Sequence, residues 1–112
     1  MDSKYGRLLA GLENTSVRTC QYAKIVALAE DEVAALNVRL GQLSILLETT
    51  PQMQDAFDEL SMECNQALKD LEILSRQAEW ARIEYLAYQK LVADFGRERR
   101  VQTRWLPRIL GY

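Results

Sequence analysis

Apolar residues recur along the second half of the chain at spacings that alternate between four and three residues. No charged residue interrupts this series, which contains Met53, Phe57, Leu60, Cys64, Ala67, Leu71, Leu74, Ala78, Ala81, Tyr85, Tyr88, Val92 and Phe95. A 3.5-residue repeat is typical of a helix that packs along another helix in a coiled coil. Thr50 and Pro51 predict where the helix begins, because threonine can cap free amides and proline tolerates the first helical position. Gly96 predicts where it ends.

The first half of the chain carries a matching repeat. Its members are Tyr5, Leu8, Leu12, Thr15, Thr19, Tyr22, Val26, Ala29, Val33, Leu36, Leu40, Leu43 and Leu47. Only Thr15 and Thr19 are polar, and Gly11 and Ser16 lie close to them. Two alternatives stay open: the helix breaks at 11–16 with Ser16 capping a second segment, or it continues with polar residues in the repeat.

The two repeats face each other when residue i is paired with residue 100 − i around a turn near 48–50. All 13 pairs then match, for example Leu40 with Leu60, and large residues face small ones, as Tyr22 faces Ala78. Such alternation favours interdigitated packing. A short connection makes consecutive helices antiparallel neighbours.

These patterns predict an all-α fold, a long antiparallel two-helix coiled-coil hairpin over residues 1–96 that is part of a larger helical bundle. Residues 97–112 form a separate basic and aromatic tail in this prediction. The 26 positions of the two repeats are called the seam below.

A second set of apolar residues lies outside the seam. In the second helix it includes Ile73, Trp80, Ile83, Leu86, Ala87 and Leu91. In the first helix, small residues recur every seven positions beside larger apolar ones: Cys20, Ala27, Ala34 and Gly41, with Ile25, Leu28, Val38, Ile45 and Leu46. A two-helix hairpin buries only one stripe of each helix, so we expect these residues to bind partner helices. For the alanines, high helix propensity alone is the alternative explanation.

The tail alternates arginine with apolar residues. Its candidate partner-binding residues are Trp105, Leu106, Ile109 and Leu110, and its candidate contacts to an anionic partner are Arg97, Arg99, Arg100, Arg104 and Arg108. Three interpretations stay open. The tail docks in a groove of another protein, folds back over Tyr5 and Phe95, or contacts nucleic acid or an anionic membrane.

Composition adds a charge asymmetry to this picture. The chain has 112 residues, of which 48% are apolar, as expected for one folded domain. Its net charge is −2, but residues 97–112 carry five arginines and one glutamate, a net of +4, which leaves −6 for residues 1–96. An acidic body with a basic tail suggests that the chain binds a partner.

Few residues in the chain could perform chemistry. Histidine, the commonest general base and metal ligand, is absent. Two cysteines are too few for a metal site, and the 100 − i register places Cys20 far from Cys64, so a disulfide would require another fold. We interpret both cysteines as packing residues and predict no enzyme, cofactor, metal site or small-molecule substrate.

The predicted function is therefore that of a non-catalytic structural or adaptor subunit in a helical multiprotein complex, a hetero-oligomer rather than a homodimer. The alternatives are a homodimeric adaptor or secretion-type chaperone, and a subunit that contacts nucleic acid through its arginine-rich tail. No segment resembles a signal peptide or approaches the roughly 20 apolar residues that cross a bilayer. Together with free thiols, this predicts an intracellular protein, cytoplasmic or nuclear.

Overall fold

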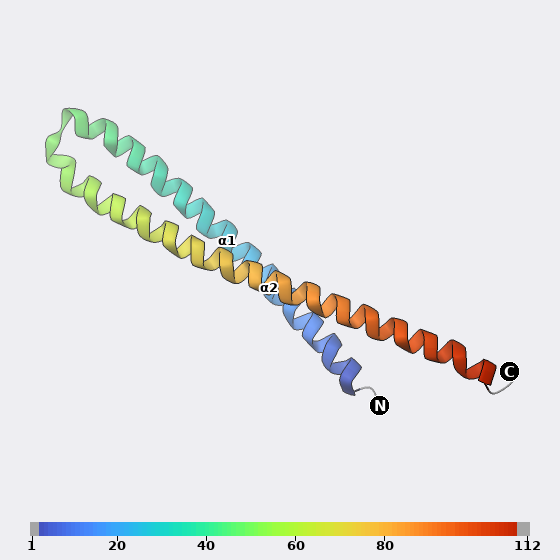
Figure 1. Ribbon diagram of the computed structural model, residues 1–112. Helices are drawn as coiled ribbons and strands as arrows, with labels where there is room; N and C mark the ends of the chain where they lie inside the picture. Colours follow the sequence, from blue (N-terminus) through green and yellow to red (C-terminus); the bar gives the residue numbers. More distant parts are fainter. Residues whose placement is uncertain (1–2, 110–112) are drawn as a thin grey trace. The chain divides into compact units, whose positions relative to one another are not determined.

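Two long α-helices and a short turn make up the described part of the chain. A computed structural model describes the backbone of residues 3–109 and the side chains of residues 3–97. Helix α1 (Ser3–Thr49) and helix α2 (Gln54–Ile109) are joined by Thr50 and the 3-10 turn η1 (Pro51–Met53) (Figure 1). The helices are antiparallel and in contact, which confirms the all-α hairpin. The larger bundle stays a prediction.

The hairpin divides into two compact units, each of which pairs a stretch of α1 with a stretch of α2. Unit 1 consists of Met1–Cys20 and Trp80–Tyr112, and unit 2 consists of Gln21–Glu79, including the turn. Every pair of the 100 − i register joins two residues of the same unit.

In unit 1, two contacts between the helices agree with the predicted register. The ring of Tyr5 stacks on that of Phe95, with 5.2 Å between ring centroids and 15° between planes. The Thr19 hydroxyl lies 3.3 Å from the carbonyl oxygen of Ala81. In each of these two pairs the residue numbers add up to 100, as the predicted register requires.

In unit 2, the register is marked by a contact of a buried cysteine. The Cys64 thiol donates a hydrogen bond to Asn37 Oδ1 at 3.0 Å, and Asn37 adjoins Leu36, the residue predicted to face Cys64. Across both units, all 26 seam positions are buried or half-buried. The heptad pattern therefore predicted the packed side of both helices correctly.

The turn is made by backbone hydrogen bonds. The Thr50 amide donates to the Leu46 carbonyl at 2.9 Å, and the Met53 amide donates to the Thr50 carbonyl at 3.1 Å. Thr50 occupies the N-cap position before Pro51, but its hydroxyl makes no capping hydrogen bond, contrary to expectation. The reason is that the chain enters a tight 3-10 turn, in which the Thr50 carbonyl, not its side chain, holds the following residues.

Helix α1 does not break at 11–16. Ser3–Thr49 is one continuous helix, so of the two alternatives the unbroken helix is correct. The Thr15 hydroxyl donates back to the Gly11 carbonyl at 2.8 Å and to the Leu12 carbonyl at 3.1 Å. A threonine hydroxyl that donates to the carbonyl four residues earlier can remain inside a continuous helix, so Thr15 does not have to interrupt α1.

The prediction that the second helix ends at Gly96 is wrong, because α2 continues to Ile109. Glycine inside a helix costs only about 1 kcal/mol relative to alanine, which good helix formers on either side can offset. An ion pair of 3.0 Å between Arg97 Nη2 and Asp94 Oδ1 spans Gly96 and supports the helical path there.

Candidate partner-binding site

The hairpin has a thin core. Among the described side chains, the buried apolar residues are few and lie in the seam: Val33, Leu36, Cys64 and Ala81. No large side chain within the described range is fully enclosed. A single layer of contacts between two helices provides little of the burial on which helix stability in proteins depends.

The outer side of α2 in unit 1 carries a row of exposed apolar residues. Trp80, Ile83, Ala87 and Leu91, here called the α2 face, follow spacings of three, four and four residues, so they share one side of the helix. All four side chains are exposed, and Trp80 keeps 64% of its surface accessible. The neighbouring Leu86 is also exposed. The structure thus brings four of the predicted partner-binding residues together on one surface.

Ile73, another predicted partner-binding residue of α2, belongs to unit 2. Its side chain is 52% exposed there. It is therefore available for a partner, as predicted, but it is described separately from the α2 face.

Close packing on the opposite side of α2 determines which way the α2 face points. The ring of Tyr88 lies directly against the α1 backbone at Gly11, where a Cβ atom would come within 2.6 Å of Tyr88 Cζ and 2.9 Å of Cδ1. Only a residue without a side chain allows this approach. From the sequence we considered a helix break near Gly11 and did not predict this contact, because no local sequence pattern indicates that Tyr88 packs against Gly11.

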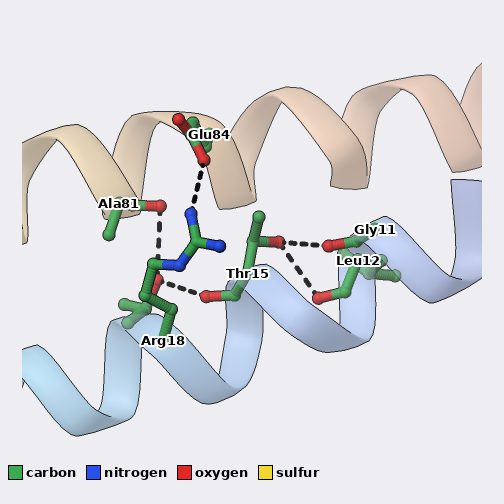
Figure 2. A network of polar contacts seen from close by, with 7 residues as sticks. Gly11, Leu12, Thr15, Arg18, Ala81 and Glu84 are labelled. Carbon is green, nitrogen blue, oxygen red and sulfur yellow. Dashed lines mark hydrogen bonds and ion pairs between the residues drawn. The ribbon is translucent and has the colours of Figure 1, made fainter.

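A polar layer within the seam of unit 1 lies beside this contact (Figure 2). Thr15 is only 4% exposed, and its hydroxyl bonds within α1 as described above. The Thr19 hydroxyl lies 2.7 Å from the Thr15 carbonyl and 3.3 Å from the Ala81 carbonyl of the other helix. Within the described residues, no buried side-chain nitrogen or oxygen lacks a partner. Satisfied polar groups in a coiled-coil seam favour one register at some cost in stability.

An ion pair between the helices borders the α2 face (Figure 2). Arg18 Nη1 lies 3.2 Å from Glu84 Oε2, and the two side chains are 52% and 34% exposed. Glu84 precedes Leu91 by seven residues, so both lie on the same side of α2. A pair this exposed contributes about 0–1 kcal/mol to stability.

Unit 2 exposes a second apolar surface, on α1. Leu28, Val38 and Ile45 are 69%, 61% and 70% exposed. The small residues Ala27, Ala34 and Gly41 are exposed as well, and a Cβ atom on Gly41 would have no neighbour within 4 Å. The described part of unit 2 therefore leaves this side of α1 uncovered, as the heptad pattern predicted.

The two cysteines differ in their surroundings, and both are free. Cys64 is a packing residue of unit 2, as expected. Cys20 is exposed in unit 1, so its interpretation as a packing residue is wrong. The reason is that Cys20 directly follows seam residue Thr19 and points outward, to a side of α1 that is not packed in this unit.

Most tail residues of the predicted site lie outside the described side chains. This holds for Arg99, Arg100, Arg104, Trp105, Leu106, Arg108, Ile109 and Leu110. Arg97 is described and pairs with Asp94. The roles predicted for the tail, including folding back over Tyr5 and Phe95, stay predictions.

Two further properties of the described residues concern metal ions and membranes. Residues whose side chains are described include no cluster of three or more His, Cys, Asp or Glu that could hold a metal ion. None of the described helical segments combines the length and apolar character needed to cross a membrane.

Comparison with known proteins gives no match: no family model, no curated protein and no solved structure resembles the chain significantly.

Proposed function

We propose that this chain is a non-catalytic structural or adaptor subunit of a helical multiprotein complex, and that the α2 face binds a partner helix. The observation that supports the proposal is the contrast between a thin core and a well-exposed apolar surface. Burial of a large apolar side chain contributes about 1.5–3 kcal/mol. Burial of the exposed side chains of Trp80, Ile83 and Leu91 by a partner would therefore stabilise the complex.

The shape of the α2 face favours a helix as the bound element. Its residues form a ridge along α2, and ridges of this kind pack into the grooves of a neighbouring helix. Trp80 is the expected anchor, because tryptophan is enriched among residues that dominate binding energy. The exposed Ala87 leaves space beside it for a close approach. The tail would add apolar and arginine contacts to the same partner complex.

Two alternatives have different support. A homodimeric adaptor or secretion-type chaperone would use the same exposed surface of α2. A nucleic-acid-contacting subunit depends on the arginines of the tail alone.

Substitution of Trp80 by aspartate tests the proposal. Affinity purification of the full chain from its native cells, followed by mass spectrometry, identifies the bound proteins. We expect Trp80→Asp to lower their recovery by about tenfold, the equivalent of losing about 1.4 kcal/mol of binding free energy. Helicity measured by circular dichroism should stay the same, because Trp80 lies outside the seam.

The matched control is Gln89→Asp. Gln89 is exposed on the same helix and lies off the α2 face, and its amide donates a hydrogen bond to the Tyr85 hydroxyl of α2 at 2.9 Å. This variant introduces the same charge and should keep its bound proteins. Equal recovery with Trp80→Asp and wild type would contradict the role of the α2 face.

A further inference from the structure

The side of α1 that faces away from the seam carries a second repeat within unit 2. Its positions alternate between spacings of three and four residues and are here called the α1 stripe. The apolar members are Ala27, Ala34, Val38, Gly41 and Ile45, and the charged members are Lys24, Asp31 and Glu48. All members are exposed, because α2 of unit 2 packs against the seam. An uncovered stripe with this spacing can pack along a further helix.

Small apolar residues lie at one end of the α1 stripe and large ones towards the other. Val38 and Ile45 project from the helix with 61% and 70% of their surface exposed. Ala27 and Ala34 leave shallow positions one and two turns before them, and a Cβ atom at Gly41 would have no neighbour within 4 Å. Interdigitated packing sets large residues against small ones. A helix that covers the stripe should therefore present its small residues to Val38 and Ile45.

The α1 stripe itself meets this requirement when its direction is reversed. If residue i of one copy faces residue 72 − i of another, Ala27 faces Ile45 and Ala34 faces Val38. Each contact occurs twice, since the same pairs form with the two copies exchanged. The stripe is therefore complementary in size to an antiparallel copy of itself.

The charged residues of the α1 stripe fit the same arrangement. It places Lys24 of each copy against Glu48 of the other, so that opposite charges meet at both ends. Within the described side chains, neither Lys24 nor Glu48 forms an ion pair. Asp31 faces Gly41, which has no side chain and leaves space for a hydrated carboxylate.

Other arrangements of two α1 stripes are less favourable. A parallel copy places each of the three charged residues against itself, and like charges that face each other are destabilising. An antiparallel copy with residue i facing 79 − i places Asp31 against Glu48. A shift by one heptad in the other direction loses the Lys24–Glu48 pairs.

Residues beside the α1 stripe add no repulsion to the 72 − i arrangement. Glu30 is the single charged residue among the flanking positions of residues 21–49, and it lies near Ser44 of the other copy. On the other flank, Leu28 lies near Gln42. Leu28 is 69% exposed, so a second copy would also bury part of this side chain.

We infer that the α1 stripe binds the α1 stripe of a second copy of this chain, antiparallel to the first, with a two-fold axis beside Leu36. From Lys24 to Glu48 the contact spans 24 helical steps, about 36 Å at 1.5 Å per step. It uses residues of unit 2 alone, whereas the α2 face belongs to unit 1. A pair joined in this way carries two α2 faces, and so two of the proposed sites for a partner helix.

Sedimentation velocity of the purified full chain tests the pairing. We expect a species of twice the 12.9 kDa chain mass at micromolar concentrations. Ala34→Glu should raise its dissociation constant by about tenfold or more, because the new carboxylates of both copies lie beside the two-fold axis, against Val38.

The matched control is Ala56→Glu. Ala56 is exposed on α2 of unit 2, outside the α1 stripe, and the substitution is the same. This variant should pair like the wild type, and so should Trp80→Asp, because the α2 face takes no part in this contact. Circular dichroism should show equal helicity for all three variants, since each substituted residue is exposed.

Charge reversal tests the direction and the register of the pair. Lys24→Glu and Glu48→Lys should each raise the dissociation constant by about tenfold, because both end contacts then bring like charges together. The double variant Lys24→Glu with Glu48→Lys should pair like the wild type, since each end again joins opposite charges. In a parallel pair the single variants would leave the repulsion unchanged, because each residue would face its own copy.

Three outcomes would overturn the inference: a wild-type monomer throughout, equal dissociation constants for Ala34→Glu and Ala56→Glu, or single charge reversals that the double reversal does not repair. A pair that is lost with Trp80→Asp and kept with Ala34→Glu would assign the contact to the α2 face instead. None of these outcomes bears on whether the α2 face binds a different protein, which the affinity purification tests.

Discussion

Gly11 shows how much a single residue without a side chain contributes to this hairpin. The Tyr88 ring occupies the space that a Cβ atom at position 11 would need. In the same turn of α1, Thr15 is buried with its hydroxyl bonded inside the helix. Together they allow α2 to approach α1 closely in unit 1.

Gly11→Ala is expected to destabilise the protein, although alanine is the better helix former. The new methyl group displaces the Tyr88 ring from the seam, and the lost packing should exceed the roughly 1 kcal/mol gained in helix propensity. Thermal unfolding followed by circular dichroism measures the effect as a lower Tm.

Gly6→Ala and Gly41→Ala are the matched controls. A Cβ atom at either position has no neighbour within 4 Å, so both variants should gain about 0.5–1 kcal/mol of stability. Combining Gly11→Ala with Tyr88→Ala removes the steric conflict, and the alanine at position 11 should then be stabilising. A Tm for Gly11→Ala as high as those of the two controls would disprove the contact.

At the level of the helices, register is the property that decides which residues meet. The Tyr5–Phe95 stack and the Thr19–Ala81 contact join residues i and 100 − i, and Cys64 bonds to Asn37, the neighbour of its predicted partner Leu36. If the antiparallel helices slipped by one heptad, they would still bury apolar residues. Polar contacts and the matching of large with small side chains therefore help to select the observed register.

Cysteines at positions 40 and 60 should crosslink within one chain. The background is Cys20→Ala with Cys64→Ala, and the added substitutions are Leu40→Cys and Leu60→Cys. Oxidation should give a monomeric disulfide that is visible as faster migration on a non-reducing gel, because the register places the two residues opposite each other.

The comparison pair for this crosslink is Leu40→Cys with Leu71→Cys. Position 71 lies 11 residues from position 60, about 16 Å along the helix, which exceeds the Cα separation of about 7 Å that a disulfide can bridge. Crosslinking of this second pair, or failure of the first, would show that the register is wrong.

The molecule has one unit with a negative net charge and one with a positive net charge, and the two partly cancel to give the total of −2. Nucleic-acid binding depends on local basic residues and on the absence of nearby repulsion. Unit 2 contains 4 basic and 11 acidic residues, a net charge of −7, which repels a polyanion. This distribution suits pairing between protein surfaces of opposite charge.

We therefore expect the full chain not to bind nucleic acid at physiological ionic strength. Fluorescence anisotropy with a labelled 20-nucleotide single strand and a 20-base-pair duplex measures this directly. Deletion of residues 97–112 should leave the anisotropy unchanged. Binding that weakens steeply with salt and disappears with the deletion would instead support the nucleic-acid alternative.

Sequence and tertiary structure each determined a different part of this protein. The heptad pattern alone predicted the hairpin, its register and the outward position of Trp80, because helical periodicity is local and the short turn leaves one way to match the two repeats. The sequence did not show that Gly11 receives Tyr88, that α1 runs unbroken past Thr15, or that α2 continues beyond Gly96. The first is a contact between residues far apart in the sequence, and the other two depend on small differences in helix propensity that packing or a neighbouring ion pair outweighs.

The division into a basic and an acidic unit was likewise decided by tertiary structure. Along the sequence, the excess of positive charge lies in the tail, and the basic residues of the first 20 positions are far from the tail in the chain. Folding α1 back along α2 places residues 1–20, with three basic and two acidic residues, in unit 1 with residues 80–112, and it leaves 11 of the 16 acidic residues in unit 2. Local periodicity thus set the helices and their register, and contacts between distant segments set the charge that each unit presents to a partner.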